Sequence, residues 1–193
     1  MAAKSVLGCA VIGASIVTPS AFAGPEWVEH NDAGSIVTTA QRTAGPGQLT
    51  SIAGHLTGGI GTSLTFGESD FEDMYLIQIT DPSSFTMQVI GADFDAQLFL
   101  FNVTLPGEGF GLLANDDFND NTSPFIGNMA TDGTGAQINL PGVYAIAISG
   151  FGRNPVSIGG EIFDMEFGDE ISGPDGPGGI NPHTGWTGDG QTG

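Results

Sequence analysis

Residues 115–121 read NDDFNDN, so three aspartates and three asparagines in seven positions could bind a cation or act as general acids and bases. Two further carboxylates, Asp93 and Asp95, stand directly before the apolar run 96–103. Alternate residues of an extended segment point to the same side, so these two share one side of the chain. If 96–103 and 110–115 pair as a hairpin, both groups of acids meet at one end of it.

Carboxylate and amide oxygens are the ligands that Ca²⁺ prefers, and it takes about six to eight of them. From Asp117 onward the chain matches the opening of an EF-hand loop, but Thr122 stands where that loop has glycine and Asn128 where it has glutamate. We therefore expect a calcium site of another kind. The alternative is a solvated turn, because Asp and Asn favour turns and Asx hydrogen bonds. The candidate ligands are Asp93, Asp95, Asp116, Asp117, Asn119 and Asp120.

A second acidic segment, residues 68–73, carries four acids in six positions immediately before the strand that is predicted to begin at Met74. Four such charges repel one another unless water or a cation screens them. The segment is either a solvated loop that discourages edge pairing or a second cation site, with Asp73 as its candidate ligand. The acids of residues 164–170 are weaker candidates.

Catalysis has less support than cation binding. Glycoside hydrolysis needs two carboxylates across a sugar cleft, yet the two tryptophans, Trp27 and Trp186, lie outside the predicted strands and supply no platform there. No G-x-S-x-G motif is present, and the three histidines have no zinc spacing. A hydrolase that acts on glycans or peptides through its acidic loops is the alternative to a protein without an activity of its own.

The N-terminus has the order of a secretory signal peptide. Lys4 precedes an apolar run to Val17, and Ala21-Phe22-Ala23 forms a small-residue cleavage site before Gly24. The run is shorter than the ~20 residues that span a bilayer, so we predict no membrane span and an extracellular or periplasmic location. The predicted signal contains Cys9, the single cysteine, so the mature chain forms no disulfide and bound metal is the usual substitute.

The chain is strongly acidic, with 3 Lys and Arg against 22 Asp and Glu and a formal net charge of −19. Removal of residues 1–23 takes Lys4 away and leaves 2 − 22 = −20. Nucleic acid and anionic membranes reward cationic proteins, so both are poor partners for this one.

Short runs of period two predict strands and no helix. We expect an all-β, antiparallel β-sandwich of about seven or eight strands, in which 74–80 and 85–91 pair as a hairpin and 96–103 is a central strand covered on both faces. An extended leader, 24–47, precedes a domain over 48–166. Residues 167–193 are rich in Gly and Pro and read as a loop or flexible tail. The predicted strands cover 49–56, 74–80, 85–91, 96–103, 110–115, 136–140 and 143–149.

Four segments, FEDMYLIQI, DFDAQLFLF, LLANDD and LPGVYAIAISG, resemble in this order the bacterial pre-peptidase C-terminal domain. The resemblance covers residues 48–150 and implies a jelly-roll-like β-sandwich. It also implies a non-catalytic accessory module of secreted bacterial proteins, stabilised by calcium in some members and able to bind polysaccharide or protein polymers. The acids that match the loops of this family are Asp73, Asp93, Asp95, Asp116 and Asp117.

The chain departs from the family at its C-terminal end, because no apolar strand follows the Gly-rich segment. Such a truncated sheet has an open edge, and an open edge invites self-association. The sequence thus predicts a secreted, calcium-stabilised, non-catalytic module for binding or structural roles at or outside the cell surface. A surface or matrix assembly protein is a further alternative.

Overall fold

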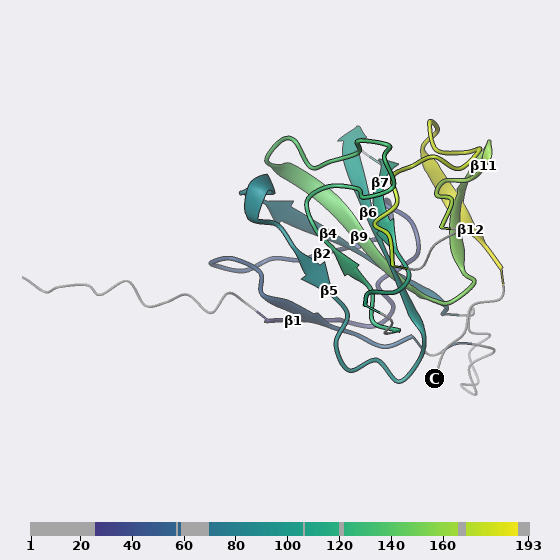
Figure 1. Ribbon diagram of the computed structural model, residues 1–193. Coiled ribbons are helices and arrows are strands. Elements are labelled where there is room, and N and C mark those ends of the chain that lie inside the picture. Colours follow the sequence, from purple (N-terminus) through teal and green to yellow (C-terminus); the bar gives the residue numbers. More distant parts are fainter. Residues whose placement is uncertain are drawn as a thin grey trace, which may run out of the picture.

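The computed structural model describes residues 26–56, 58, 70–105, 107–119, 122–165 and 169–188. Twelve strands make the described chain all-β, and the one helical element among the described residues is the short 3-10 turn η1 (Pro82–Ser84). A five-stranded sheet in the order β2-β4-β9-β6-β7 lies at the centre (Figure 1). Its strands are β2 (Gln41–Arg42), β4 (Glu72–Ile79), β9 (Gly142–Gly150), β6 (Ala96–Leu105) and β7 (Glu108–Asn115).

Apolar side chains on both faces of this sheet form two buried clusters. In β6, Leu98 and Leu100 belong to one cluster, whereas Phe99 and Phe101 belong to the other. All four are at most 6% exposed, which confirms that residues 96–103 form a central strand covered on both faces. The sheet therefore needs covering elements on either side, because each face would otherwise leave apolar surface in water.

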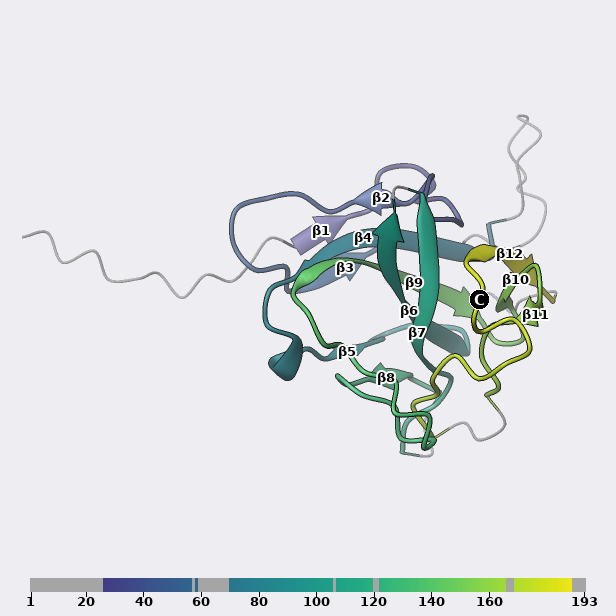
Figure 2. The same cartoon turned by 90° about the horizontal axis from the view of Figure 1, so that it is seen from above.

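Short sheets and loops supply these covers (Figure 2). On one face lie β3 (Ser51–Ala53) and the pair of β5 (Met87–Gln88) and β8 (Phe125–Ile126). On the other face lies the three-stranded sheet of β11 (Gly160–Glu161), β10 (Asn154–Ser157) and β12 (His183–Thr187). Aromatic rings fill this second interface, since the Phe99 ring lies 5.9 Å from that of Phe163 and 5.4 Å from that of Trp186.

The hairpin predicted between 74–80 and 85–91 is wrong. β4 pairs with β9 along its whole length and with β2 at Tyr75 and Leu76, and residues 85–91 pair with neither of its edges. The chain leaves the sheet at η1, where the Asp81 carboxylate accepts a hydrogen bond of 3.1 Å from the Ser83 amide. β5 then pairs with β8 in antiparallel register. Residues 136–140 also form no strand and contribute only a bridge between Met129 and Gln137.

The leader segment takes part in two sheets. β1 (Glu26–Val28) pairs in parallel with β3, and β2 pairs in parallel with β4. Between them, the Gly34 carbonyl accepts a hydrogen bond of 2.9 Å from the Met74 amide at the start of β4. The predicted signal peptide, residues 1–23, lies outside the described residues. No helix in the described part of the chain is long and apolar enough to cross a membrane.

Of the two alternatives predicted for the Gly/Pro-rich segment, a loop or a flexible tail, the second does not describe residues 169–188, which contain β12 and form bridges to β7. Bridges join Ala114 to Ser172 and Phe110 to Pro182, so this segment runs along the outer edge of β7. Glycine allows the close approach of backbones: a Cβ on Gly178 would fall 2.2 Å from the Gly160 carbonyl oxygen. The same glycines that suggested flexibility therefore permit dense packing.

Candidate metal centres

Three carboxylates lie close together at the open end of the β6–β7 hairpin, where β6 begins and β7 ends. We call Asp95, Asp116 and Asp117 the hairpin cluster; each offers one oxygen, and these oxygens all lie within 4.8 Å of one another. Asp95 directly precedes β6 and Asp116 directly follows β7, and the antiparallel register pairs Leu98 with Asn115. The prediction that these acids meet at one end of a hairpin is confirmed.

The environment of the hairpin cluster disfavours uncompensated negative charge. Asp116 is 8% exposed, and burial, followed by the charges of Asp117 and Asp95, raises the pKa of its carboxyl to about 7; a hydrogen bond with the Gln97 side chain acts in the opposite direction. Burial also raises the pKa of Asp117, and Asp95 adds to the effect. The Oδ1 atoms of all three aspartates are buried without a hydrogen-bond partner in the described part of the chain.

Asn115, the first residue of the acidic stretch, has a structural role beside the cluster. Its side chain is fully buried, its Nδ2 donates to the Glu170 carbonyl at 2.8 Å, and its Oδ1 accepts from the Phe125 amide at 2.7 Å. The Asn115 side chain therefore links the start of the acidic loop to its end at Phe125, and also to the segment after residue 169 that lies along β7. The loop turns at Asn119, which has a φ of 54° in the left-handed region that asparagine tolerates.

A second group of three carboxylates lies at the start of β4. We call Asp32, Asp70 and Asp73 the leader cluster, because Asp32 comes from the leader between β1 and β2; their ligand oxygens also lie within 4.8 Å of one another. Glu29 stands beside them, its Oε2 accepting from the His55 amide at 2.8 Å and its Oε1 from the Ala33 amide at 3.1 Å.

Asp73 is the most deeply buried acid of the leader cluster. It is 1% exposed, and burial, followed by the charges of Glu29 and Asp70, raises the pKa of its carboxyl to about 8. The Tyr75 hydroxyl donates to its Oδ2 at 3.2 Å, whereas its Oδ1 is buried without a partner in the described residues. Burial and the neighbouring carboxylates also raise the pKa of Tyr75, which keeps the hydroxyl a donor.

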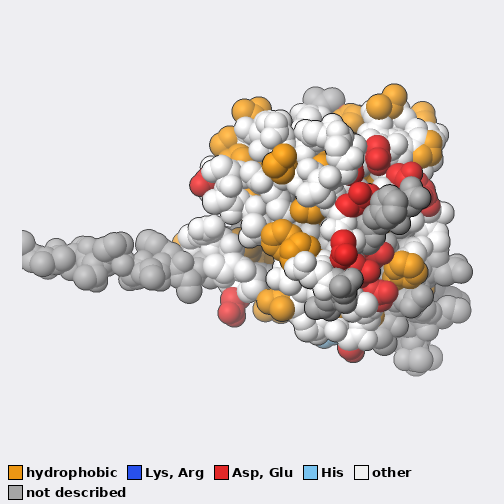
Figure 3. Space-filling model, viewed as in Figure 1, with side chains coloured by type: hydrophobic (Ala, Val, Ile, Leu, Met, Phe, Trp, Pro, Cys, Tyr) orange, Lys and Arg blue, Asp and Glu red, His pale blue; other side chains and the backbone are white. Residues whose placement is uncertain are grey.

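Both clusters lie at the same end of the five-stranded sheet. Glu72 of β4 and Gln97 of β6 both pair with Ser149 of β9, so β4 and β6 begin at the same level. Acidic side chains gather on one side of the face shown in Figure 3. Among the described residues the one ion pair joins Arg153 to Glu72, with the Arg153 Nε 2.8 Å from Glu72 Oε2. This cation therefore compensates Glu72 and neither cluster.

The structure sorts the predicted ligands into three groups. Asp73, Asp95, Asp116 and Asp117 belong to clusters, whereas Asp93 and Asn119 are exposed and Asp93 belongs to neither cluster. Asp120 lies outside the described residues. Sequence reasoning missed Asp32 and Glu29, because nothing in their spacing relates them to β4, and it had a signal for Asp70 in the acidic run 68–73.

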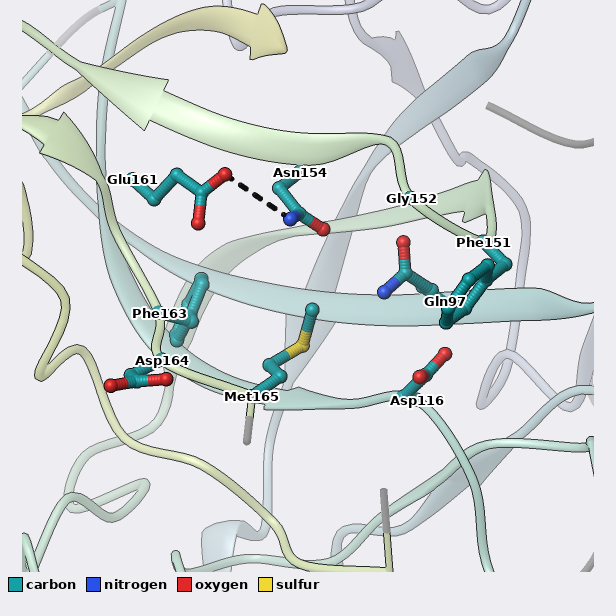
Figure 4. Close-up of a pocket in the computed structure, with 9 residues that line it drawn as sticks. All are labelled: Gln97, Asp116, Phe151, Gly152, Asn154, Glu161, Phe163, Asp164 and Met165. Atoms are coloured by element: carbon teal, nitrogen blue, oxygen red, sulfur yellow. Dashed lines mark hydrogen bonds between the residues drawn. The ribbon is translucent and has the colours of Figure 1, made fainter. Parts of the chain in front are cut away.

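A pocket of about 330 Å³ adjoins the hairpin cluster through Asp116 (Figure 4). Gln97 and Phe151 line the same side of it as Asp116, while Asn154 and Glu161 line the opposite side and are joined by a hydrogen bond of 3.3 Å. This end of the sheet thus offers oxygen ligands for a cation next to a cavity with both polar and apolar walls.

Comparisons of the chain with protein-family models, with curated proteins and with solved structures found no match. The resemblance to the pre-peptidase C-terminal domain accordingly stays a prediction, and the chemistry of the two clusters carries the functional conclusion.

Proposed function

We propose that this protein is a secreted module in which Ca²⁺ stabilises a non-catalytic, jelly-roll-like β-sandwich that serves binding or structural roles at or outside the cell surface. One observation carries the proposal. In each cluster a carboxylate more than nine-tenths buried, Asp73 or Asp116, faces two further carboxylates within 4.8 Å. Burying such a charge is costly unless a cation or hydrogen bonds compensate it.

Calcium suits the ligands better than other cations. Each cluster consists of aspartate oxygens, which are hard ligands, whereas zinc sites usually include His or Cys. Ca²⁺ accepts irregular coordination by six to eight oxygens, and Mg²⁺ demands a near-ideal octahedron. Asp95, Asp116 and Asp117 would hold one ion, and Asp32, Asp70 and Asp73 a second.

Two further features support the remaining parts of the proposal. The five-stranded sheet has elements packed on both faces, as a sandwich requires. The order of Lys4, the apolar run and Ala21-Phe22-Ala23 is that of a secretory signal, and extracellular calcium is abundant enough to occupy weak sites.

The test is a melting experiment in calcium and in EDTA. At ~1 mM free Ca²⁺ and a Kd near 0.1 mM, each site contributes about 1.4 kcal/mol to the free energy of unfolding. Asp73→Asn and Asp116→Asn should each remove one such increment. The matched control is Asp93→Asn, which changes an exposed acid outside both clusters and should keep the full response.

The same variants should change sign in EDTA. Without the cation, the buried carboxylate of Asp73 destabilises the fold, so Asp73→Asn should be more stable than the wild type in EDTA and less stable in calcium. A melting temperature that responds to neither calcium nor EDTA would contradict the proposal and favour the solvated-turn alternative.

A further inference from the structure

The pocket beside the hairpin cluster has an unusual hydrogen-bonding character, because its buried amide groups offer acceptors. Asn154 uses its Nδ2 to donate to Glu161 Oε1, which leaves its Oδ1 buried and without a partner in the described residues. Gln97 is 2% exposed and has a partnerless, buried Oε1. Buried polar atoms normally have partners, so these acceptors point to a ligand that donates hydrogen bonds.

The walls of the pocket indicate the shape of this ligand. Phe151 is 43% exposed at the rim and Met165 stands between the two polar sides (Figure 4), so an apolar face of the ligand would find contacts beside the amide groups. A volume of about 330 Å³ is at the small end of ligand pockets, which span roughly 300–1,000 Å³. One small ring fits this space better than a long chain.

Asp116 connects the pocket to the proposed calcium ion. It lines the pocket and belongs to the hairpin cluster. Three aspartates do not fill the six to eight coordination positions of Ca²⁺, so oxygens of a ligand in the pocket can complete them. Such a ligand must offer lone pairs to the cation and O–H donors to Gln97 and Asn154. Vicinal hydroxyl groups do both, whereas an ammonium group donates only and is repelled by the cation.

We propose that this pocket binds one sugar ring through two neighbouring hydroxyl groups, in a manner that depends on calcium in the hairpin cluster. The two hydroxyl oxygens coordinate the ion, one of these hydroxyls donates to the amide oxygen of Gln97 on the same side, another hydroxyl of the ring donates to the amide oxygen of Asn154 on the opposite side, and the C–H face of the ring packs on Phe151. The inference rests on the proposed calcium site and adds the ligand class that this site takes. The leader cluster has no part in it.

The experiment is an NMR titration of the calcium-loaded protein with methyl glycosides of mannose, galactose and glucose. The side-chain amide signals of Gln97 and Asn154 should shift with at least one glycoside in calcium and with none in EDTA. Glycerol, an acyclic source of neighbouring hydroxyls, should bind more weakly because it has no ring face for Phe151. Equal binding of glycerol would overturn the assignment to a sugar.

Variants separate this inference from the calcium site itself. Asn154→Leu changes a pocket residue outside both clusters, so it should keep the stabilisation by calcium and weaken glycoside binding about tenfold, the effect of losing one hydrogen bond. Asp116→Asn should lose both responses, and Asp93→Asn should lose neither. Stabilisation by calcium without any glycoside-induced shift would overturn the inference alone. No stabilisation by calcium would overturn the proposed function.

Discussion

The hairpin cluster and the leader cluster each contain three carboxylates with ligand oxygens within 4.8 Å of one another, and both lie at the same end of one sheet, yet they are built differently. The hairpin cluster comes from two adjacent strands and adjoins a pocket. The leader cluster joins Asp32, from the segment between β1 and β2, to the start of β4, and the Tyr75 hydroxyl donates a hydrogen bond to its Asp73. A cation at the first can meet a ligand, whereas a cation at the second ties the leader to the sheet.

A third arrangement at this end of the sheet is an acid paired with a cation, because Glu72 forms an ion pair with Arg153. Substitution of Arg153 is the prediction with the largest expected effect. Arg153 Nε and Nη2 donate to the two carboxylate oxygens of Glu72 at 2.8 and 3.1 Å. Arg153→Gln would leave the buried Glu72 uncompensated, so the free energy of unfolding should fall by about 3 kcal/mol, measured by chemical denaturation.

The loss in Arg153→Gln should be the same in calcium and in EDTA, since this ion pair is separate from both clusters. The double variant Glu72→Gln/Arg153→Met should lose less, because it leaves no buried charge behind. If calcium restored the full stability of Arg153→Gln, Glu72 would be a ligand of the same ion as the leader cluster. The ion pair and the leader cluster would then not be separate.

The pH dependence of the free energy of unfolding also distinguishes the two clusters, with a smaller expected effect than that of Arg153→Gln. The pKa of the Asp73 carboxyl is raised from 3.8 to about 8 in the fold. The stability that the protonated carboxyl contributes to the free energy of unfolding is therefore fully present below pH 3.8 and is lost as the pH rises to about 8. In EDTA the free energy of unfolding should therefore fall by about 2 kcal/mol between pH 6.5 and 8, measured by urea denaturation.

Variants assign this slope to its source. Asp73→Asn should flatten it, whereas Asp116→Asn should remove only the part below about pH 7, where the Asp116 carboxyl finishes its titration. In calcium the slope should reverse, because the cation competes with protons for the same oxygens. An equal slope in wild type and Asp73→Asn would show that the buried carboxyl is not the source.

Gly54 offers the smallest and most local test. A Cβ at this position would lie 2.5 Å from the Tyr75 hydroxyl and 2.7 Å from Glu29 Oε2, so Gly54→Ala pushes on the leader cluster from one side. We expect a loss of about 1 kcal/mol and a smaller calcium increment from the leader cluster, measured by melting in the Asp116→Asn background.

The control for Gly54 is Gly185→Ala, where an added Cβ meets nothing within 4 Å. It should leave both calcium increments unchanged. A Gly54→Ala protein with an undiminished calcium response would show that the leader cluster does not depend on its Tyr75 side.

Some of this architecture is predictable because it depends on neighbours in sequence. The alternation of Tyr75, Ile77 and Ile79 gives β4, and the apolar run at 96–103 gives a doubly covered strand, since period-two burial is local to the strand. The hairpin cluster follows from the pairing of adjacent strands, so Asp95, Asp116 and Asp117 were within reach of the sequence. The sequence could not show that Asp95 joins the cluster and Asp93 does not, because both are aspartates on the same side of the chain.

The pairing partners of strands were less predictable. Proximity in sequence suggested that 85–91 pairs with 74–80, but β4 is flanked by β2 and β9, which come from far away in the chain. Composition likewise suggested a loose segment after residue 167, whereas glycine also permits the close backbone contacts that pack 169–188 against the sheet. Local propensity does not contain the long-range contacts that decide between these outcomes.

By itself, the sequence determined the all-β class, the acidic character and the carboxylates that one hairpin brings together. The tertiary structure decided which of those acids meet, which are exposed, and that Asp32 and Asp70 join Asp73. It also decided where Asn115 of the stretch NDDFNDN is fastened and how Asp116 comes to line a pocket. Residue types set what chemistry is available, but burial and proximity give charges their energy, and both depend on segments remote in the chain.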